Sequence, residues 1–85
     1  SVEAYRARRP LPGLTARQSL IADLISDGLT NGQVASYLGL SVKTVDHHVA
    51  AVFNRLDLPD RRALSRWVRA ARKADGTSPA QPTAP

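Results

Sequence analysis

Residues 30–56, TNGQVASYLGLSVKTVDHHVAAVFNRL, decide the fold of this chain. Their apolar and small residues recur at helical spacing on both sides of the tripeptide Gly39-Leu40-Ser41. This pattern predicts a helix from Thr30 to about residue 38, a three-residue turn, and a second helix over residues 42–56. Gly39 can take the positive φ that a sharp helix stop needs. We therefore expect two helices that are joined by a short turn.

The spacing within this stretch favours a helix-turn-helix over an ordinary helical hairpin. The small Ala35 allows two helix backbones to approach closely, and Val45 begins the apolar stripe that holds the second helix against the first. In a helix-turn-helix the second helix lies in the DNA major groove. Its outward stripe is the candidate reading surface, and it is short, polar and nearly uncharged: Lys43, His47, Ala50 and Asn54.

Two further helices are predicted around this motif. Thr15 and Gln18 form a capping box before an apolar stripe that extends to about residue 27, and Asp60 caps a helix that extends to about residue 73. Thr30 and Gln33 form a second capping box, and Tyr37 is expected to face inward. The sequence thus predicts an all-α, four-helix domain over residues 14–74.

The two ends of the chain have a different composition. Residues 1–13 are expected to be a linker, with a short helix in its first part as an alternative. Residues 75–85 contain three prolines and almost no apolar bulk, so we predict a disordered tail. The chain contains no Met, which favours a fragment of a longer protein.

Composition narrows the function classes. Eighty-five residues make one domain, and the chain has no Cys for a disulfide or a thiolate metal site. The adjacent His47 and His48 point about 100° apart on a helix, so no metal or other cofactor is expected. No apolar run approaches the ~20 residues that cross a membrane, and no signal-peptide pattern occurs. No paired carboxylates or Gly-rich phosphate loop suggest an enzyme. We expect a cytoplasmic binding domain.

The net charge of +5 is unevenly distributed. In residues 41–58, Lys43 and Arg55 balance Asp46 and Asp57, so that the candidate reading helix and its ends are neutral. Residues 59–74 carry six basic side chains against Asp60, a net charge of +5. A basic surplus suits an anionic partner such as nucleic acid, but here it lies outside the reading helix.

Residues 14–58, LTARQSLIADLISDGLTNGQVASYLGLSVKTVDHHVAAVFNRLDL, resemble the LuxR-type, or GerE-like, helix-turn-helix domain. The Leu14-Thr15 entry and the SVKTV segment after the glycine turn carry most of the resemblance. It implies a four-helix DNA-binding domain of bacterial transcription regulators, including response regulators. In that family the third helix reads bases and the fourth carries a dimer contact. The resemblance also implies an upstream signal-sensing domain and RNA polymerase as partners.

The resemblance assigns roles to individual residues. Family base contacts fall at Asp46, His47 and Ala50, and the acid at 46 departs from the basic or amide residue that the family often has there. A carboxylate can accept a hydrogen bond from cytosine N4. Phosphate contacts or positioning roles are predicted for Lys43, Thr44, Asn31, Asn54 and Arg55. The apolar stripe of the fourth helix predicts a homodimer contact through Leu64, Trp67 and Val68.

Two alternatives remain beside sequence-specific binding of double-stranded DNA. A neutral third helix with Asp46 also fits a protein-interaction module on a helix-turn-helix scaffold. The last region of a sigma factor uses a similar helix-turn-helix to recognise promoters, although the Leu14-Thr15 entry and the SVKTV turn favour the LuxR type. Affinity that falls steeply with salt would separate DNA binding from the interaction module.

Overall fold

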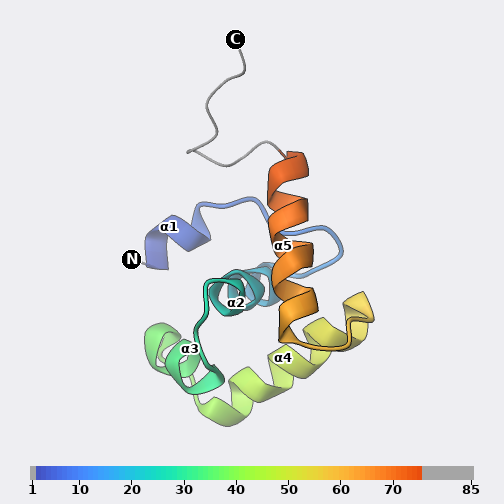
Figure 1. Ribbon diagram of the computed structural model, residues 1–85. Helices are drawn as coiled ribbons and strands as arrows, with labels where there is room; N and C mark the ends of the chain where they lie inside the picture. Colours follow the sequence, from blue (N-terminus) through green and yellow to red (C-terminus); the bar gives the residue numbers. More distant parts are fainter. Residues whose placement is uncertain (1, 76–85) are drawn as a thin grey trace.

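The computed structural model describes residues 2–75, and this part of the chain is all-helical (Figure 1). Five helices follow one another: α1 Val2–Arg6, α2 Ala16–Ser26, α3 Asn31–Leu38, α4 Val42–Leu56 and α5 Arg61–Asp75. The predicted all-α class and the four predicted helices, α2 to α5, are confirmed. The predicted disordered tail lies outside the described residues except for Asp75, the last residue of α5.

The helices begin where the sequence provides caps. Thr15 accepts from the backbone N–H of Gln18 at 3.1 Å, and the Gln18 side chain accepts from the backbone N–H of Thr15 at 3.0 Å. Thr30 and Gln33 repeat this capping box before α3. The Asp60 carboxylate accepts from the backbone N–H of Ala63 at 2.8 Å and caps α5. These bonds satisfy N–H groups that the first helical turn leaves without partners.

Left-handed residues end both helices of the helix-turn-helix. Gly39 has φ 69° and ψ 33° at the end of α3, as the sequence predicts. Asp57 has φ 54° and ψ 50° and ends α4 two residues before Pro59. Because Asp tolerates this conformation better than most side chains, the chain stops α4 without a second glycine.

The core forms around α2, which lies at the centre of the molecule and contacts each of the other four helices (Figure 1). Ile21 and Leu24 of α2 are fully buried together with Val34 of α3 and Val45 of α4. Ala35, within α3, is 3% exposed, which fits its predicted role in close packing of α3 and α4. Tyr37 was expected to face inward, and this prediction is wrong: its side chain is 40% exposed and its ring meets the Tyr5 ring of α1 at 87°.

The segment before α2 packs against the domain, in contrast to the exposed chain that a linker implies. Leu11 is 2% exposed in the core, and its backbone N–H donates to the buried Ser19 hydroxyl at 2.8 Å. The Tyr5 hydroxyl of α1 donates to the Asp27 carboxylate. Short helices gain little from their own hydrogen bonds, so contacts of this kind stabilise α1.

A buried acid connects this segment to α5. The Asp23 carboxylate, 1% exposed, accepts from Arg72 Nε at 3.2 Å and from Arg72 Nη2 at 2.6 Å. Arg8 Nη1 lies 3.3 Å from the same carboxylate, and Arg72 Nη1 donates to the carbonyl of Arg9. The start of the chain, α2 and the end of α5 therefore meet at one carboxylate.

Candidate nucleic-acid interface

The outward face of α4 results from the same periodicity that builds its inward face. Val45, Val49 and Val52 are buried and lie three or four residues apart, where α4 contacts α2 and α3. The opposite stripe is exposed: Lys43, His47, Ala50 and Asn54. Among the described residues these side chains form no hydrogen bond or ion pair. Their donors and acceptors are therefore available to a ligand.

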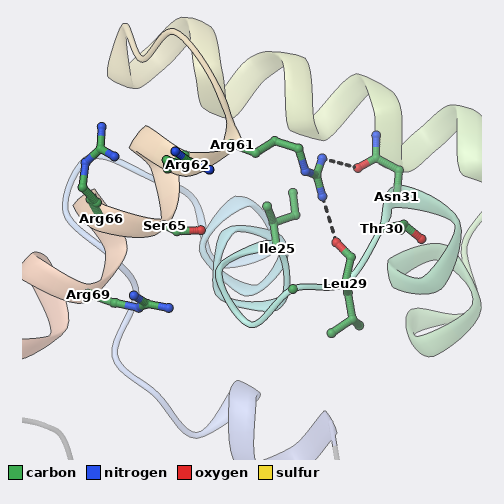
Figure 2. A pocket seen from close by; sticks show the side chains of 10 residues that line it. Ile25, Leu29, Thr30, Asn31, Arg61, Arg62, Ser65, Arg66 and Arg69 are labelled. Carbon is green, nitrogen blue, oxygen red and sulfur yellow. Dashed lines mark hydrogen bonds between the residues drawn. The ribbon is translucent and has the colours of Figure 1, made fainter.

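Asp46 lies beside this stripe and is joined to α3 and α5 through Asn31. The Asn31 Nδ2 donates to Asp46 Oδ1 at 2.8 Å. Arg61 Nη1 donates to Asn31 Oδ1 at 2.9 Å, and Arg61 Nη2 donates to the Leu29 carbonyl at 2.8 Å (Figure 2). With its oxygen and nitrogen both engaged, the Asn31 amide has a fixed orientation and positions the Asp46 carboxylate. Oδ2 of Asp46 accepts no hydrogen bond within residues 2–75.

Two other predicted phosphate contacts also have partners inside the domain. The backbone N–H of Thr44 donates to Ser41 Oγ at 3.1 Å, and the Ser41 hydroxyl donates to Thr44 Oγ1 at 2.9 Å. Arg55 Nε donates to the Gly13 carbonyl at 2.9 Å. The Arg55 guanidinium keeps four further N–H donors. Phosphate contacts by these two residues stay predictions, and both side chains are exposed.

The two histidines lie next to each other with different surroundings. His47 is exposed and His48 is half-buried. Their ring centroids are 6.2 Å apart with 68° between the ring planes. No group of three or more His, Cys, Asp or Glu side chains that could hold a metal occurs within the described part of the chain. Of the two histidines, only the exposed His47 belongs to the outward stripe of α4.

The three predicted dimer contacts do not share an exposed surface. Leu64 is fully buried and Val68 is 3% exposed, so both pack inside the domain. Trp67 is half-buried and packs beside the core. An amphipathic stripe predicts burial, and α5 packs against α2, so the dimer contact stays a prediction.

Sequence reasoning missed Arg61 and Asp23. Arg61 is one of six basic side chains in residues 59–74, and no local signal connects it to Asn31, 30 residues earlier. Asp23 had a usable signal, because it is a lone acid among the apolar residues of α2. Its long-range partner Arg72, 49 residues later, had no such signal.

No helix within residues 2–75 is long and apolar enough to span a membrane.

Comparison with known proteins places this arrangement among regulators. Residues 12–68 match the family described as bacterial regulatory proteins, luxR family. The uncharacterized response regulatory protein YgeK of Escherichia coli is 47% identical over 45 residues, which are 53% of this chain and 31% of that protein. The DNA-binding transcriptional activator DevR/DosR of Mycobacterium tuberculosis is 38% identical over 58 residues, 68% of this chain and 27% of that protein.

A third relative extends over more of the chain. The two-component response regulator PprB of Pseudomonas aeruginosa is 36% identical over 69 residues, 80% of this chain and 25% of that protein. The chain thus spans about a quarter to a third of the length of these curated relatives. No solved structure is significantly similar to it.

Proposed function

The chain belongs to the luxR family of bacterial regulatory proteins, whose helix-turn-helix domain binds DNA in transcription regulation, and on this premise we propose that α4 lies in the major groove and reads base sequence. One observation carries the proposal. The α4 stripe of Lys43, His47, Ala50 and Asn54 is exposed and forms no hydrogen bond or ion pair within residues 2–75, while Val45, Val49 and Val52 on the opposite face are buried. A helix held in this way presents its side chains to base edges at fixed positions.

We propose that Asp46, His47 and Ala50 contact bases. Asp46 keeps Oδ2 available to accept a hydrogen bond from cytosine N4, because Asn31 engages only Oδ1. His47 can donate to a guanine N7 or O6, and the Ala50 methyl can meet a thymine methyl. The fixed Asn31 amide supports this role, since it limits the rotamers of the Asp46 side chain.

Positioning on the duplex is assigned to side chains at both ends of α4 and at the start of α3. Lys43 and Thr44 lie in the first turn of α4, where free N–H groups and the helix dipole favour phosphate. Asn31 lies at the start of α3, the helix that crosses the backbone in this motif. Asn54 and Arg55 lie at the far end of α4 and contact phosphates from there. Such contacts set orientation and carry no base preference.

Selection of bound duplexes from a random library tests the proposal with the 85-residue chain. We expect an enriched motif with a C·G pair opposite Asp46. Mutating Asp46 or His47 to Ala should change the preferred sequence, whereas Lys43→Ala should weaken binding to all duplexes alike. The base-reading assignment is wrong if all three variants weaken binding uniformly.

Salt dependence separates this function from a protein-interaction module. A domain that neutralises phosphates loses affinity steeply as salt rises, since bound counterions are released from the DNA. The neutral α4 and Asp46 are the observations that favour the interaction module. If the chain shows no affinity for any duplex even at low salt, the interaction module is the better assignment.

Pairing of two copies through α5 is a separate proposal. With Leu64 and Val68 in the core, we assign the contact to the half-buried Trp67 and the exposed Ala70 one turn away. Two copies would then bind half-sites about one helical turn apart. Sedimentation on an inverted-repeat duplex tests this, and Ala70→Glu should abolish the two-to-one complex. One domain per duplex at saturation would rule it out.

The domain is further proposed to be the DNA-binding part of a longer cytoplasmic regulator. The matched relatives are three to four times longer than the aligned segments, and two of those described above are response regulators. We infer an additional signal-sensing domain and, as the target of regulation, RNA polymerase. Isolation of the natural full-length protein with its bound partners checks both inferences.

A further inference from the structure

An arginine-lined groove lies beside the helix-turn-helix, outside the α4 stripe. It has a volume of about 590 Å³ and lies between α5 and the turn that joins α2 to α3. Four arginines of α5 line it together with Thr30 and Asn31 at the start of α3: Arg61, Arg62, Arg66 and Arg69 (Figure 2). The wall that faces α5 contains no acidic side chain. The groove is therefore strongly positive.

Three of these arginines have no hydrogen-bond or ion-pair partner in the described part of the chain. Arg61 is bound to Asn31 and to the Leu29 carbonyl. In contrast, Arg62, Arg66 and Arg69 are exposed and form no hydrogen bond or ion pair within residues 2–75. They lie at spacings of four and three residues, on one side of α5. At about 1.5 Å per residue they span roughly 10 Å of the helix.

One end of the groove reaches the candidate reading face. Asn31 lines the groove and also donates to Asp46, the neighbour of His47 in the α4 stripe. A duplex seated on α4 would therefore pass its backbone close to the start of α3 and toward α5. This continuity favours nucleic acid as the occupant over an acidic protein that docks independently of DNA.

The cations of α4 and of the groove differ in number. Sequence-specific DNA-binding proteins make half or more of their hydrogen bonds to phosphate and sugar. The α4 stripe offers a single cation, Lys43, with Asp46 beside it. Three arginines of α5 that form no hydrogen bond or ion pair within residues 2–75 add positive charge beside the few phosphate contacts assigned to α4.

We propose that this groove binds backbone phosphates of the duplex outside the segment that α4 reads. The proposal rests on the proposed DNA-binding function and adds a second contact surface to it. Arg62, Arg66 and Arg69 donate to phosphate oxygens, and Arg61 holds Asn31 at the junction between the groove and the reading face. The groove raises affinity for every sequence and contributes no base preference.

A charge-matched pair of variants tests the proposal. The double variant R66Q/R69Q removes two groove arginines, and R6Q/R17Q removes two exposed arginines near α1 and the start of α2, with the same change in net charge. Binding of the full chain to a selected duplex is measured by fluorescence anisotropy across a salt series. Thermal melting of both variants confirms that they fold.

The groove variant should lower the slope of log affinity against log salt by about 2, which corresponds to two lost phosphate contacts. The control variant should leave the slope nearly unchanged. In addition, neutral methylphosphonate linkages in the flanking DNA should weaken binding of the unmodified protein and have little further effect on R66Q/R69Q. Base preference should be the same in all three proteins.

Each result other than the expected one would contradict a different part of the proposal. If the two variants behave alike on DNA, the groove proposal is wrong while the DNA-binding function stands. If R66Q/R69Q leaves DNA binding intact but abolishes binding to a polyglutamate peptide, the groove serves an acidic protein instead. If the unmodified protein binds no duplex at all, the proposed function itself has failed.

Discussion

Asp23 of α2 and Arg72 of α5 form a two-point ion pair at the edge of the core, with Arg72 Nη2 2.6 Å from Asp23 Oδ2. The carboxylate is 1% exposed and the arginine side chain 13% exposed, so water screens the pair only weakly. Arg8 approaches the same carboxylate at 3.3 Å but is 42% exposed. The two arginines therefore contribute unequally to stability.

This inequality predicts different costs for different substitutions. Asp23→Ala should lower the free energy of unfolding by about 3–5 kcal/mol, because it leaves the Arg72 guanidinium buried without its partner. Arg8→Gln should cost about 1 kcal/mol or less, since an exposed ion pair is worth little. Urea denaturation of both variants checks the difference. If both variants lose the same free energy of unfolding, the buried pair of Asp23 and Arg72 is not the main source of stability here.

Two glycines of the helix-turn-helix should respond to alanine in opposite directions. Gly39→Ala should destabilise the domain by about 1–2 kcal/mol, because φ is 69° there and a side chain in left-handed conformation is strained. Gly32 is helical, and a Cβ there would meet only Thr30 Oγ1 at 3.9 Å. Gly32→Ala should therefore stabilise the domain by about 0.5–1 kcal/mol. Thermal or urea unfolding measures both effects, and a gain from Gly39→Ala would contradict the turn geometry.

The phenol of Tyr5 should titrate at unusually high pH. Its hydrogen bond to Asp27, followed by desolvation and the Asp27 charge, raises the pKa of Tyr5 to about 12. The folded state favours the protonated phenol of Tyr5. The stability that the protonated phenol contributes is therefore complete below about pH 10 and is lost as pH rises toward 12. Ultraviolet titration of a Tyr37→Phe variant isolates Tyr5. The added substitution Asp27→Ala should bring the pKa back toward 10, and an unchanged pKa would exclude the Asp27 bond as its cause.

The Asp46 carboxylate should control base preference. Asp46→Asn keeps an acceptor for Asn31 but removes the charge, whereas Asp46→Ala also frees the Asn31 amide. Both should increase affinity for non-specific duplexes, and both should reduce discrimination at one base pair by about 1–3 kcal/mol. Competition between selected and scrambled duplexes measures this.

Asp57→Asn is the control for this experiment, since it removes the same charge at the end of α4, away from the stripe. It should increase non-specific affinity slightly and leave discrimination unchanged. A loss of discrimination in Asp57→Asn equal to that in Asp46→Asn would mean that net charge, and not a base contact, sets the preference.

Local signals in the sequence were sufficient for much of this fold. The capping side chains of Thr15, Thr30 and Asp60 act within three residues of their partners, and Gly39 acts through its own backbone. Such features depend on short-range chemistry that a sequence displays directly. The helix bounds and the exposed stripe of α4 follow from the same local periodicity.

Contacts between distant polar side chains were not predictable in this way. Arg72 and Asp23 are 49 residues apart, and Arg61 and Asn31 are 30 apart. A polar side chain that packs once against another helix leaves no periodic pattern. The apolar stripe of α5 was ambiguous for a related reason, because periodicity predicts that Leu64 and Val68 are buried without indicating which surface buries them.

The anchoring of residues 5–11 has a consequence for anything joined ahead of them. Tyr5, Arg8, Arg9 and Leu11 attach this stretch to α2 and to the last turns of α5. A folded module fused before residue 2 would not swing freely as on a random-coil tether, because its direction of approach is set by the domain itself. Release of this segment would take the Arg9 carbonyl away from Arg72, so that it would also weaken the attachment of the end of α5.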